Sequence, residues 1–132
     1  MVEESILKEL IKGARLARSK AYAPYSGYKV GAAVLSSDGE IYTGCNIENA
    51  SYGLSNCAER TAIFKMVSEG KCEIKAMAII GSGDTPAFPC GACRQVISEF
   101  ATGDTEIIVL YSEDKYQVYT LKDLLPHTFK LD

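Results

Sequence analysis

Three cysteines and one glutamate in the middle of the chain have the types and the spacing of a catalytic metal site. Cys90 and Cys93 form a C-x-x-C pair, which lets two thiolates on a tight turn or a first helical turn hold one metal ion. Cys57 offers a third sulfur from a separate element, and Glu59 follows it two residues later. Three protein ligands leave one position of a tetrahedral zinc open, as in catalytic sites, whereas structural sites are closed by four ligands. We therefore expect one Zn²⁺ per chain, held by these three cysteines.

Glu59 is the member of this group that can move protons. A carboxyl group in a partly buried, dry site can take a proton from water and return protons to nitrogen atoms of a substrate. Its small apolar neighbours Ala58 and Ala62 are consistent with such burial. We expect Glu59 to be the general acid and base of a hydrolytic reaction in which water adds to an electrophilic carbon and an amine leaves.

Three thiolates outweigh the charge of one Zn²⁺, and the resulting negative site is a weaker Lewis acid unless the charge is offset. Helix N-termini and arginines that donate hydrogen bonds to the sulfurs can supply the offset. Arg60 and Arg94 are the candidates, and Arg60 is favoured because it follows Glu59 directly. The alternative for Arg60 is a surface arginine without a role at the metal.

Two other interpretations of the cysteines fit the sequence less well. A structural zinc closed by Cys45 or His127 leaves the position of Glu59 unexplained, and a redox C-x-x-C gives Cys57 no role. We expect Cys45 and Cys72, which lie outside the proposed ligand set, to be small buried hydrophobic residues.

The composition favours a single intracellular domain that acts on a small molecule. The 132 residues are expected to form one domain, 1–132, and carry a net charge of −3 with scattered basic residues, unlike the basic face of a typical nucleic-acid binder. No apolar stretch approaches the ~20 residues of a membrane span, and the acidic N-terminus does not look like a signal peptide. Five cysteines without an export signal indicate reduced thiols, so we expect a cytoplasmic protein that binds neither nucleic acid nor a membrane.

The hydrophobic pattern predicts alternating helices and strands in an α/β arrangement, with helices packed on a sheet. Two strand–loop–helix junctions place Cys57 and Cys90 at helix N-termini, where the helix dipole favours thiolates. The predicted helices are 4–20, 57–68, 90–101 and 121–125, and the predicted strands are 30–36, 40–46, 75–81, 106–111 and 116–119.

Two polar residues after the second strand are candidates for substrate binding. Asn46 and Glu48 stand two residues apart, so in an extended segment their side chains face the same side. An amide and a carboxylate on one side suit a polyol such as ribose. The tyrosine-rich loop 22–28 forms either packing or the wall of a ligand pocket.

Taken together, these motifs resemble the cytidine deaminases, in particular the small homotetrameric kind with a three-cysteine zinc site. The resemblance extends over nearly the whole chain and rests chiefly on Asn-Ile-Glu-Asn at 46–49, Cys-Ala-Glu-Arg-Thr-Ala at 57–62 and Pro-Cys-Gly-Ala-Cys-Arg-Gln at 89–95. It implies a three-layer α/β/α sandwich on a five-strand mixed sheet. The implied reaction is the zinc-dependent hydrolytic deamination of cytidine and deoxycytidine to uridine and deoxyuridine plus ammonia, in pyrimidine salvage.

The resemblance also implies roles for individual residues. Cys57, Cys90 and Cys93 would bind zinc, and Glu59 would carry the protons. The remaining implied contacts are Asn46 and Glu48 with the ribose hydroxyls, the Ala58 backbone with the base carbonyl, Tyr28 stacked on the base, and Tyr52 and Phe129 reaching the site of a neighbouring subunit. Family members often have Phe where this chain has Tyr28, which keeps the ring and adds a hydroxyl.

Three competing functions are distinguishable. A deaminase of a cytosine-nucleoside antibiotic of the blasticidin type would share the metal set, but the Asn46–Ala50 block suits an ordinary ribose. A deaminase of RNA or single-stranded DNA would need a basic groove along the phosphates. A zinc-binding interaction module without activity would leave Glu59 without a purpose.

Overall fold

The computed structural model describes residues 2–131 and shows the predicted order of helices and strands. The elements in chain order are α1 (Glu4–Arg18), β1 (Val30–Ser36), β2 (Ile41–Cys45), the short 3₁₀ helix η1 (Tyr52–Leu54), α2 (Ala58–Ser68), β3 (Ile74–Gly81), α3 (Gly91–Phe100), β4 (Glu106–Leu110), β5 (Tyr116–Thr120) and α4 (Leu121–Leu124). No helix in the described part of the chain is long and apolar enough to cross a membrane.

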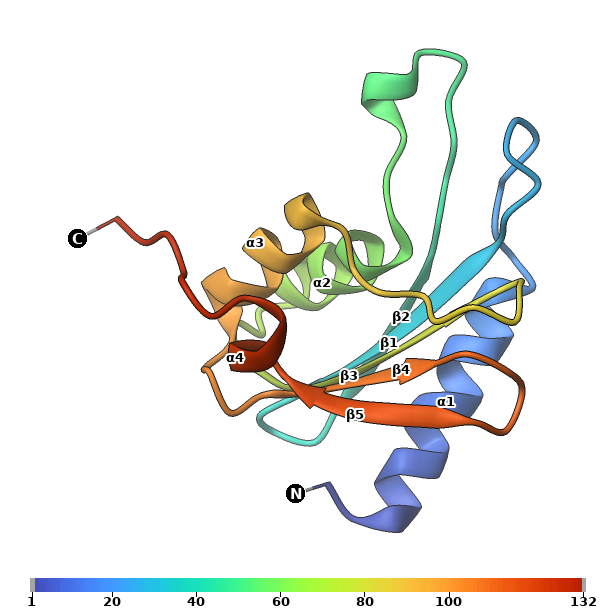
Figure 1. The fold of residues 1–132 in the computed structure, drawn as a ribbon. Helices are drawn as coiled ribbons and strands as arrows, with labels where there is room; N and C mark the ends of the chain where they lie inside the picture. The colour runs from blue at the N-terminus through green and yellow to red at the C-terminus, as the bar shows by residue number, and fades with distance from the viewer. Residues whose placement is uncertain (1, 132) are drawn as a thin grey trace.

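The strands form one mixed sheet between two layers of helices. The strand order is β2-β1-β3-β4-β5, in which β3 and β4 pair in parallel and all other neighbours pair antiparallel. Helix α1 covers one face of the sheet, and α2 and α3 cover the opposite face (Figure 1). The predicted three-layer α/β/α sandwich with a five-strand mixed sheet is confirmed.

Each face of the sheet has its own hydrophobic core because successive side chains of a strand point to opposite faces. Strands β1, β3 and β4 are apolar almost throughout, as expected of strands covered on both sides. The core under α1 includes Leu10, Ala14, Ala33, Leu35, Ala76, Ala78, Ile80, Ile108 and Leu110. The core under α2 and α3 includes Ala32, Val34, Ala62, Ile63, Met66, Met77, Ile79, Ile97 and Ile107. The buried face of α2 begins at Ala58 and Glu59, so the second core fixes the start of the helix that carries the proposed acid/base.

Small residues let α1 lie very close to β1. A Cβ atom added to Gly31 would lie 1.9 Å from the carbonyl oxygen of Ala14 and 2.5 Å from the backbone nitrogen of Arg18. These are backbone atoms of a helix and cannot turn aside as a side chain can. The absence of a side chain at Gly31 therefore sets the distance between helix and sheet.

Replacing Gly31 with alanine is expected to lower the free energy of unfolding by about 3 kcal/mol, at the upper end of overpacking effects, because the whole helix must shift. The matched control is Gly53→Ala, since no described atom lies within 4 Å of the added Cβ and the expected change is below about 0.5 kcal/mol. Urea unfolding of both variants measures the difference, and equal stabilities would contradict the packing described for α1.

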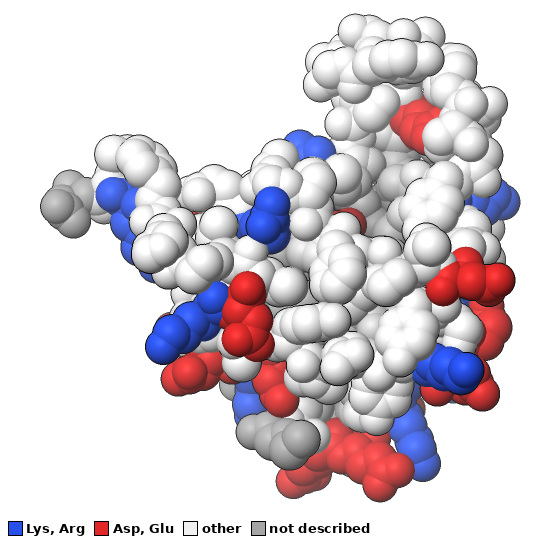
Figure 2. All heavy atoms as spheres, viewed as in Figure 1, with Lys and Arg blue, Asp and Glu red and all other residues white. Residues whose placement is uncertain are grey.

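The surface carries charges of both signs. Figure 2 shows Lys and Arg interspersed with Asp and Glu on the face that it presents, without a continuous basic stripe. The prediction that Cys72 is a small buried residue is wrong, because Cys72 is exposed in the connection between α2 and β3. Cys45, at the end of β2, is partly buried.

Candidate active site

Two helix N-termini bring the three cysteines together. Cys57 is the N-cap of α2 and Cys90 the N-cap of α3, both with extended backbone, while Cys93 lies in the first turn of α3 and is fully buried. The partial positive charge of a helix N-terminus favours negative groups at these positions. The fold thus directs two favourable dipoles at the same small group of thiols.

The distances between the sulfurs fit a single zinc ion. All three Sγ atoms lie within 4.8 Å of one another, and the Sγ atoms of Cys57 and Cys90 are 4.0 Å apart. Two sulfurs on a tetrahedral Zn²⁺ lie about 3.8 Å apart, given Zn–S bonds of about 2.3 Å. Within residues 2–131 this group contains no fourth Cys, His, Asp or Glu, so neither Cys45 nor His127 closes the site. The donor set is that of a zinc site with one coordination position left for solvent or substrate.

Arg60 lies against the thiols, whereas Arg94 does not. The Nη2 atom of Arg60 donates a hydrogen bond of 3.3 Å to the sulfur of Cys57, and Nη1 of Arg94 donates one of 2.8 Å to the backbone oxygen of Leu124. The pKa of Cys57 is lowered by a hydrogen bond with the Cys93 thiol and, to a smaller extent, by the Arg60 guanidinium. The same thiol–thiol hydrogen bond, together with burial, raises the pKa of Cys93. The pair therefore loses one proton readily and holds the other, which a divalent cation would displace.

Glu59 is buried beside the cysteines, in the first turn of α2. Only 4% of its surface is exposed. Burial raises the pKa of Glu59 to about 7, and the neighbouring Cys57 thiolate acts in the same direction. A carboxyl group with a pKa near neutrality can both accept and release a proton at physiological pH, as a general acid and base must.

A cavity of about 340 Å³ opens above these residues. Its size is that of a small-ligand site, and it combines apolar walls with a few polar groups. The residues that line it are Tyr28, Val30, Asn46, Glu48, Ser55, Asn56, Cys57, Ala58, Glu59, Ile79, Pro86, Ala87, Phe88 and Cys90. The structure thus brings together most of the residues that the sequence singles out, from five separate segments of the chain.

Several lining residues are not found by reasoning from the sequence. Phe88 is the most notable, because its ring is half exposed in the cavity wall and packs edge-on against Tyr119 at 5.3 Å between ring centroids. Its position in the sequence could have indicated this role, because Phe88 lies two residues before the proposed ligand Cys90 and must therefore lie close to the metal site. Asn56 precedes Cys57 in the same way, and its amide donates to the hydroxyl of Thr61 at 3.1 Å.

Asn46 and Glu48 hold the loop before β1 and still have capacity for a ligand. The Asn46 oxygen accepts a hydrogen bond from the Val30 N–H at 2.8 Å, and its amide donates one to the Tyr28 carbonyl at 2.8 Å. An amide group has two N–H donors, so one is left for a ligand.

The Glu48 carboxylate accepts hydrogen bonds from the backbone N–H groups of Tyr25 and Ser26 and from the Ser26 hydroxyl. These bonds, the Ser26 hydroxyl first, lower the pKa of Glu48 and keep it ionised. A carboxylate has about four acceptor positions, so one remains for a ligand. The two side chains thus shape one end of the cavity and can also contact a polyol.

Tyr52 and Phe129 lie outside the cavity of their own chain. Tyr52 is 78% exposed in η1 and Phe129 is 65% exposed in the C-terminal segment. Tyr52 borders a shallow depression of about 440 Å³ that shares Glu48 and Ser55 with the cavity wall. Neither ring is part of the cavity wall in a single chain.

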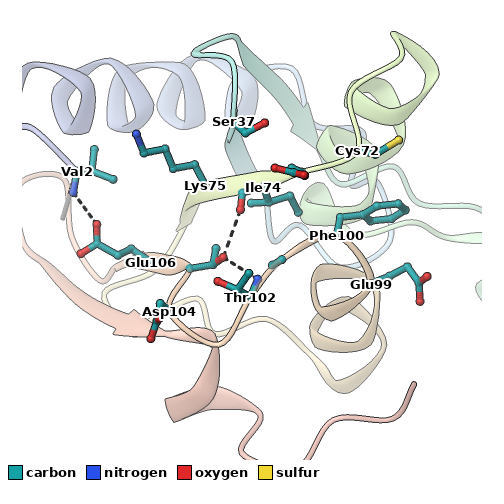
Figure 3. A pocket seen from close by; sticks show the side chains of 13 residues that line it. Val2, Ser37, Cys72, Ile74, Lys75, Glu99, Phe100, Thr102, Asp104 and Glu106 are labelled. Carbon is teal, nitrogen blue, oxygen red and sulfur yellow. Dashed lines mark hydrogen bonds between the residues drawn. The ribbon is translucent and has the colours of Figure 1, made fainter. Parts of the chain in front are cut away.

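A larger cavity, of about 550 Å³, lies elsewhere (Figure 3). It is found at the amino ends of β3 and β4, beside the C-terminal end of α3. Its buried hydroxyl, on Thr105, already donates to the Ile74 carbonyl at 3.2 Å and accepts from the Thr102 N–H at 3.1 Å. The smaller cavity lies instead at the carboxyl end of β3, where ligands bind in α/β sheets. Cys57, Cys90 and Glu59 line it, so the smaller cavity is the candidate active site.

A zinc-dependent hydrolytic enzyme on a mixed α/β/α sandwich is the class that this fold and site define. Residues 4–110 match the family described as "Cytidine and deoxycytidylate deaminase zinc-binding region". The chain belongs to this family of zinc-binding deaminases, as its resemblance to the cytidine deaminases predicts.

Individual relatives agree with the family assignment over most of their length. The chain is 50% identical over 120 residues to the cytidine deaminase of Halalkalibacterium halodurans, covering 91% of each chain. It is 47% identical over 123 residues to the cytidine deaminase of Sporosarcina psychrophila, covering 93% of this chain and 90% of that one. Among solved structures, the cytidine deaminase of Burkholderia pseudomallei superposes with a TM-score of 0.87 at 47% identity, covering 92% of this chain and 98% of that chain.

Proposed function

We propose that this chain is a cytidine deaminase, which hydrolyses cytidine and deoxycytidine to uridine and deoxyuridine with release of ammonia, as a single domain serving pyrimidine salvage. The observation that carries the proposal is one cavity lined by Cys57, Cys90 and a buried glutamate with a pKa near 7, where the Cys93 thiol completes a set of three at zinc-ligand distances. The relatives named cytidine deaminase support the choice of substrate.

The cysteines provide the place for the metal. Cys57, Cys90 and Cys93 would hold Zn²⁺, which when bound acidifies a water molecule for attack on the base. Arg60 donates to the Cys57 sulfur and so draws electron density from the thiolate set. We infer that this contact offsets part of the negative charge that three thiolates place at the site.

Glu59 performs the proton transfers. Its carboxylate takes a proton from the attacking water and delivers it to the ring nitrogen next to the reacting carbon. It then takes the second proton of that water and passes it to the amino group, which leaves as ammonia while the carbon keeps the oxygen. The burial of Glu59 keeps bulk water away from these transfers and holds its pKa where both directions are possible.

The remaining cavity residues orient the nucleoside. The Ala58 N–H is at the first position of α2, where a helix leaves its N–H groups without intrahelical partners, so it can donate to the base carbonyl. The remaining N–H of Asn46 and the remaining acceptor position of Glu48 suit the ribose hydroxyls. Tyr28 supplies an aromatic wall for the base, and Phe88 supplies a second one.

A homotetramer in the cytoplasm completes the proposal. Exposed apolar residues gather on the two segments that project from the body in Figure 1, the excursion around η1 and the C-terminal tail. They are Tyr52, Leu54, Phe129 and Leu131. Exposed apolar groups on projecting segments are candidates for contact with another subunit. Association would bring Tyr52 and Phe129 to the cavity of a neighbouring subunit, and a reducing compartment would keep the three thiols available for zinc.

Replacing Phe129 with alanine is expected to lower cytidine turnover by about 10-fold or more, as the loss of a buried aromatic interface residue does, while the zinc content stays unchanged. Tyr116→Ala, which removes a partly exposed ring on β5 outside the cavity, is the control. Activity assays, metal analysis and light scattering give the three readouts. Unchanged activity together with unchanged assembly would contradict a shared active site.

The decisive test of the substrate is the loss of ultraviolet absorbance of cytidine compared with a single-stranded oligonucleotide and a cytosine-nucleoside antibiotic, under identical conditions. We expect turnover of cytidine and deoxycytidine and none of the oligonucleotide, because the face in Figure 2 shows no basic track for phosphates. Deamination of the oligonucleotide or the antibiotic alone would contradict the proposal, as would zinc binding without turnover of any of them.

A further inference from the structure

Gly81, the last residue of β3, lies against the aromatic ring that forms one wall of the active-site cavity. A Cβ atom at this position would lie 2.0 Å from the Oη atom and 2.7 Å from the Cζ atom of Tyr28. The backbone does not require glycine, because the φ angle of Gly81 is not positive. Its carbonyl oxygen is held by the Arg18 guanidinium at 2.8 Å. What glycine supplies at this position is therefore space for the end of the tyrosine ring.

The backbone on the other side of this contact is equally fixed. The Tyr28 carbonyl accepts a hydrogen bond from the Asn46 amide at 2.8 Å. The Lys29 N–H donates to the hydroxyl of Ser82 at 2.6 Å, and that hydroxyl lies 2.6 Å from the Lys29 carbonyl, to which it donates. These bonds tie residues 28–29 to the residue that follows Gly81. If a methyl group were added at position 81, the tyrosine side chain would have to move, because the two backbones are held together.

The direction of that movement is restricted. Ala87 is 8% exposed, and its Cβ atom lies 3.3 Å from the position that a Cβ of Gly81 would take, so the space on that side is filled. The Tyr28 side chain is 38% exposed and lines the cavity, so it can turn toward the cavity or toward solvent. Either turn costs little stability, since no core residue is displaced. Both turns change the wall of the cavity.

We propose that Gly81 is a positioning residue for Tyr28, and that the pair fixes the space left for the planar base of the substrate. The inference rests on the proposed nucleoside deamination, in which the ring of Tyr28 lies along the base. It explains how the site accommodates the additional hydroxyl of Tyr28, which makes no hydrogen bond within residues 2–131 and is placed over the one position of β3 without a side chain.

The test is a double-mutant cycle with Gly81→Ala and Tyr28→Phe, in which kcat and KM for cytidine, zinc content and thermal stability are measured for each protein. Gly81→Ala is expected to raise KM about 10-fold, a partial loss of base–aromatic stacking, with unchanged zinc and little change in the unfolding temperature. Tyr28→Phe is the second single variant of the cycle, and its own effect on KM is expected to be smaller than that of Gly81→Ala, because the ring is kept and the lost hydroxyl is not part of a hydrogen bond.

The double variant is expected to recover part of the loss, because removing Oη removes the 2.0 Å contact, while the remaining 2.7 Å contact with Cζ still requires a smaller shift of the ring. Gly83→Ala, two residues later in the loop that follows β3, is the matched control, since its added Cβ would have no described neighbour nearer than 3.8 Å. Its KM is expected to equal that of the unchanged protein.

An unchanged KM in Gly81→Ala would overturn the proposal, and so would effects of the two substitutions that simply add. Failure of the proposed function is distinguishable, because the unchanged protein would then fail to deaminate cytidine. In that case a crystal structure of Gly81→Ala still tests whether a side chain at position 81 displaces the Tyr28 ring, since this measurement does not depend on activity. A displaced Tyr28 ring supports the inference, and a ring in its present place overturns it.

Discussion

Glu59→Gln is expected to bind zinc normally and to lose about 10⁴-fold in cytidine turnover, the upper end of the range for general acid–base catalysis. The effect is large because one carboxyl group is proposed to make every proton transfer of the reaction. Glutamine keeps the shape of the side chain and can donate a hydrogen bond, but it cannot take up a proton at neutral pH. Measurement of kcat and of zinc per chain on the same sample tests this result.

The control for this variant is Glu9→Gln, which makes the same chemical change on the exposed face of α1 and is expected to leave kcat unchanged. A Glu59→Gln protein with a near-native rate would remove Glu59 from the mechanism. A variant that loses its zinc would show instead that Glu59 supports the metal site.

Cys90→Ser is expected to abolish activity by removing the metal. A serine hydroxyl is not ionised at neutral pH and is a poor zinc ligand, so the loss in zinc affinity should exceed the 10–100-fold typical of residues around the ligands. Because Cys90 is exposed at the N-cap of α3, the exchange of sulfur for oxygen disturbs no packed core.

Cys72→Ser is the matched control, since Cys72 is an equally exposed cysteine outside the thiol cluster. Its zinc content and turnover are expected to equal those of the unchanged protein. Full activity of Cys90→Ser, or loss of zinc from Cys72→Ser, would contradict the assignment of the ligands.

The zinc site could be predicted from the sequence because its chemistry is local. Each pair lies within a single helical turn, Cys57 with Glu59 at the start of α2 and Cys90 with Cys93 at the start of α3. The starts of these helices can be predicted from the apolar residues that follow them. The layers of the fold could be predicted for a related reason. Strands β1, β3 and β4 are apolar along almost their whole length, which indicates a helix layer on each face.

Other features depend on contacts between distant parts of the chain, and these have no local signal. Tyr28 and Gly81 lie against each other although they are 53 positions apart in the sequence, and the same separation holds for the hydrogen-bonded pair Lys29 and Ser82. The role of Phe88 as a wall depends on the contact of its ring with Tyr119 of β5. The prediction for Cys72 was wrong because a free cysteine has the apolar character of a core residue wherever it lies, and only the path of the chain shows that this one lies in an exposed connection.

The central claim is that three thiolates hold one zinc ion and leave a position free for the reaction. The most direct measurement strips the metal from the purified protein with a chelator and restores it by titration with Zn²⁺, while the rate of cytidine loss is followed. We predict no turnover without metal and a rate that rises linearly and reaches a plateau at one zinc per chain. Turnover by the metal-free protein would contradict this account, as would a fully reloaded protein that remains inactive.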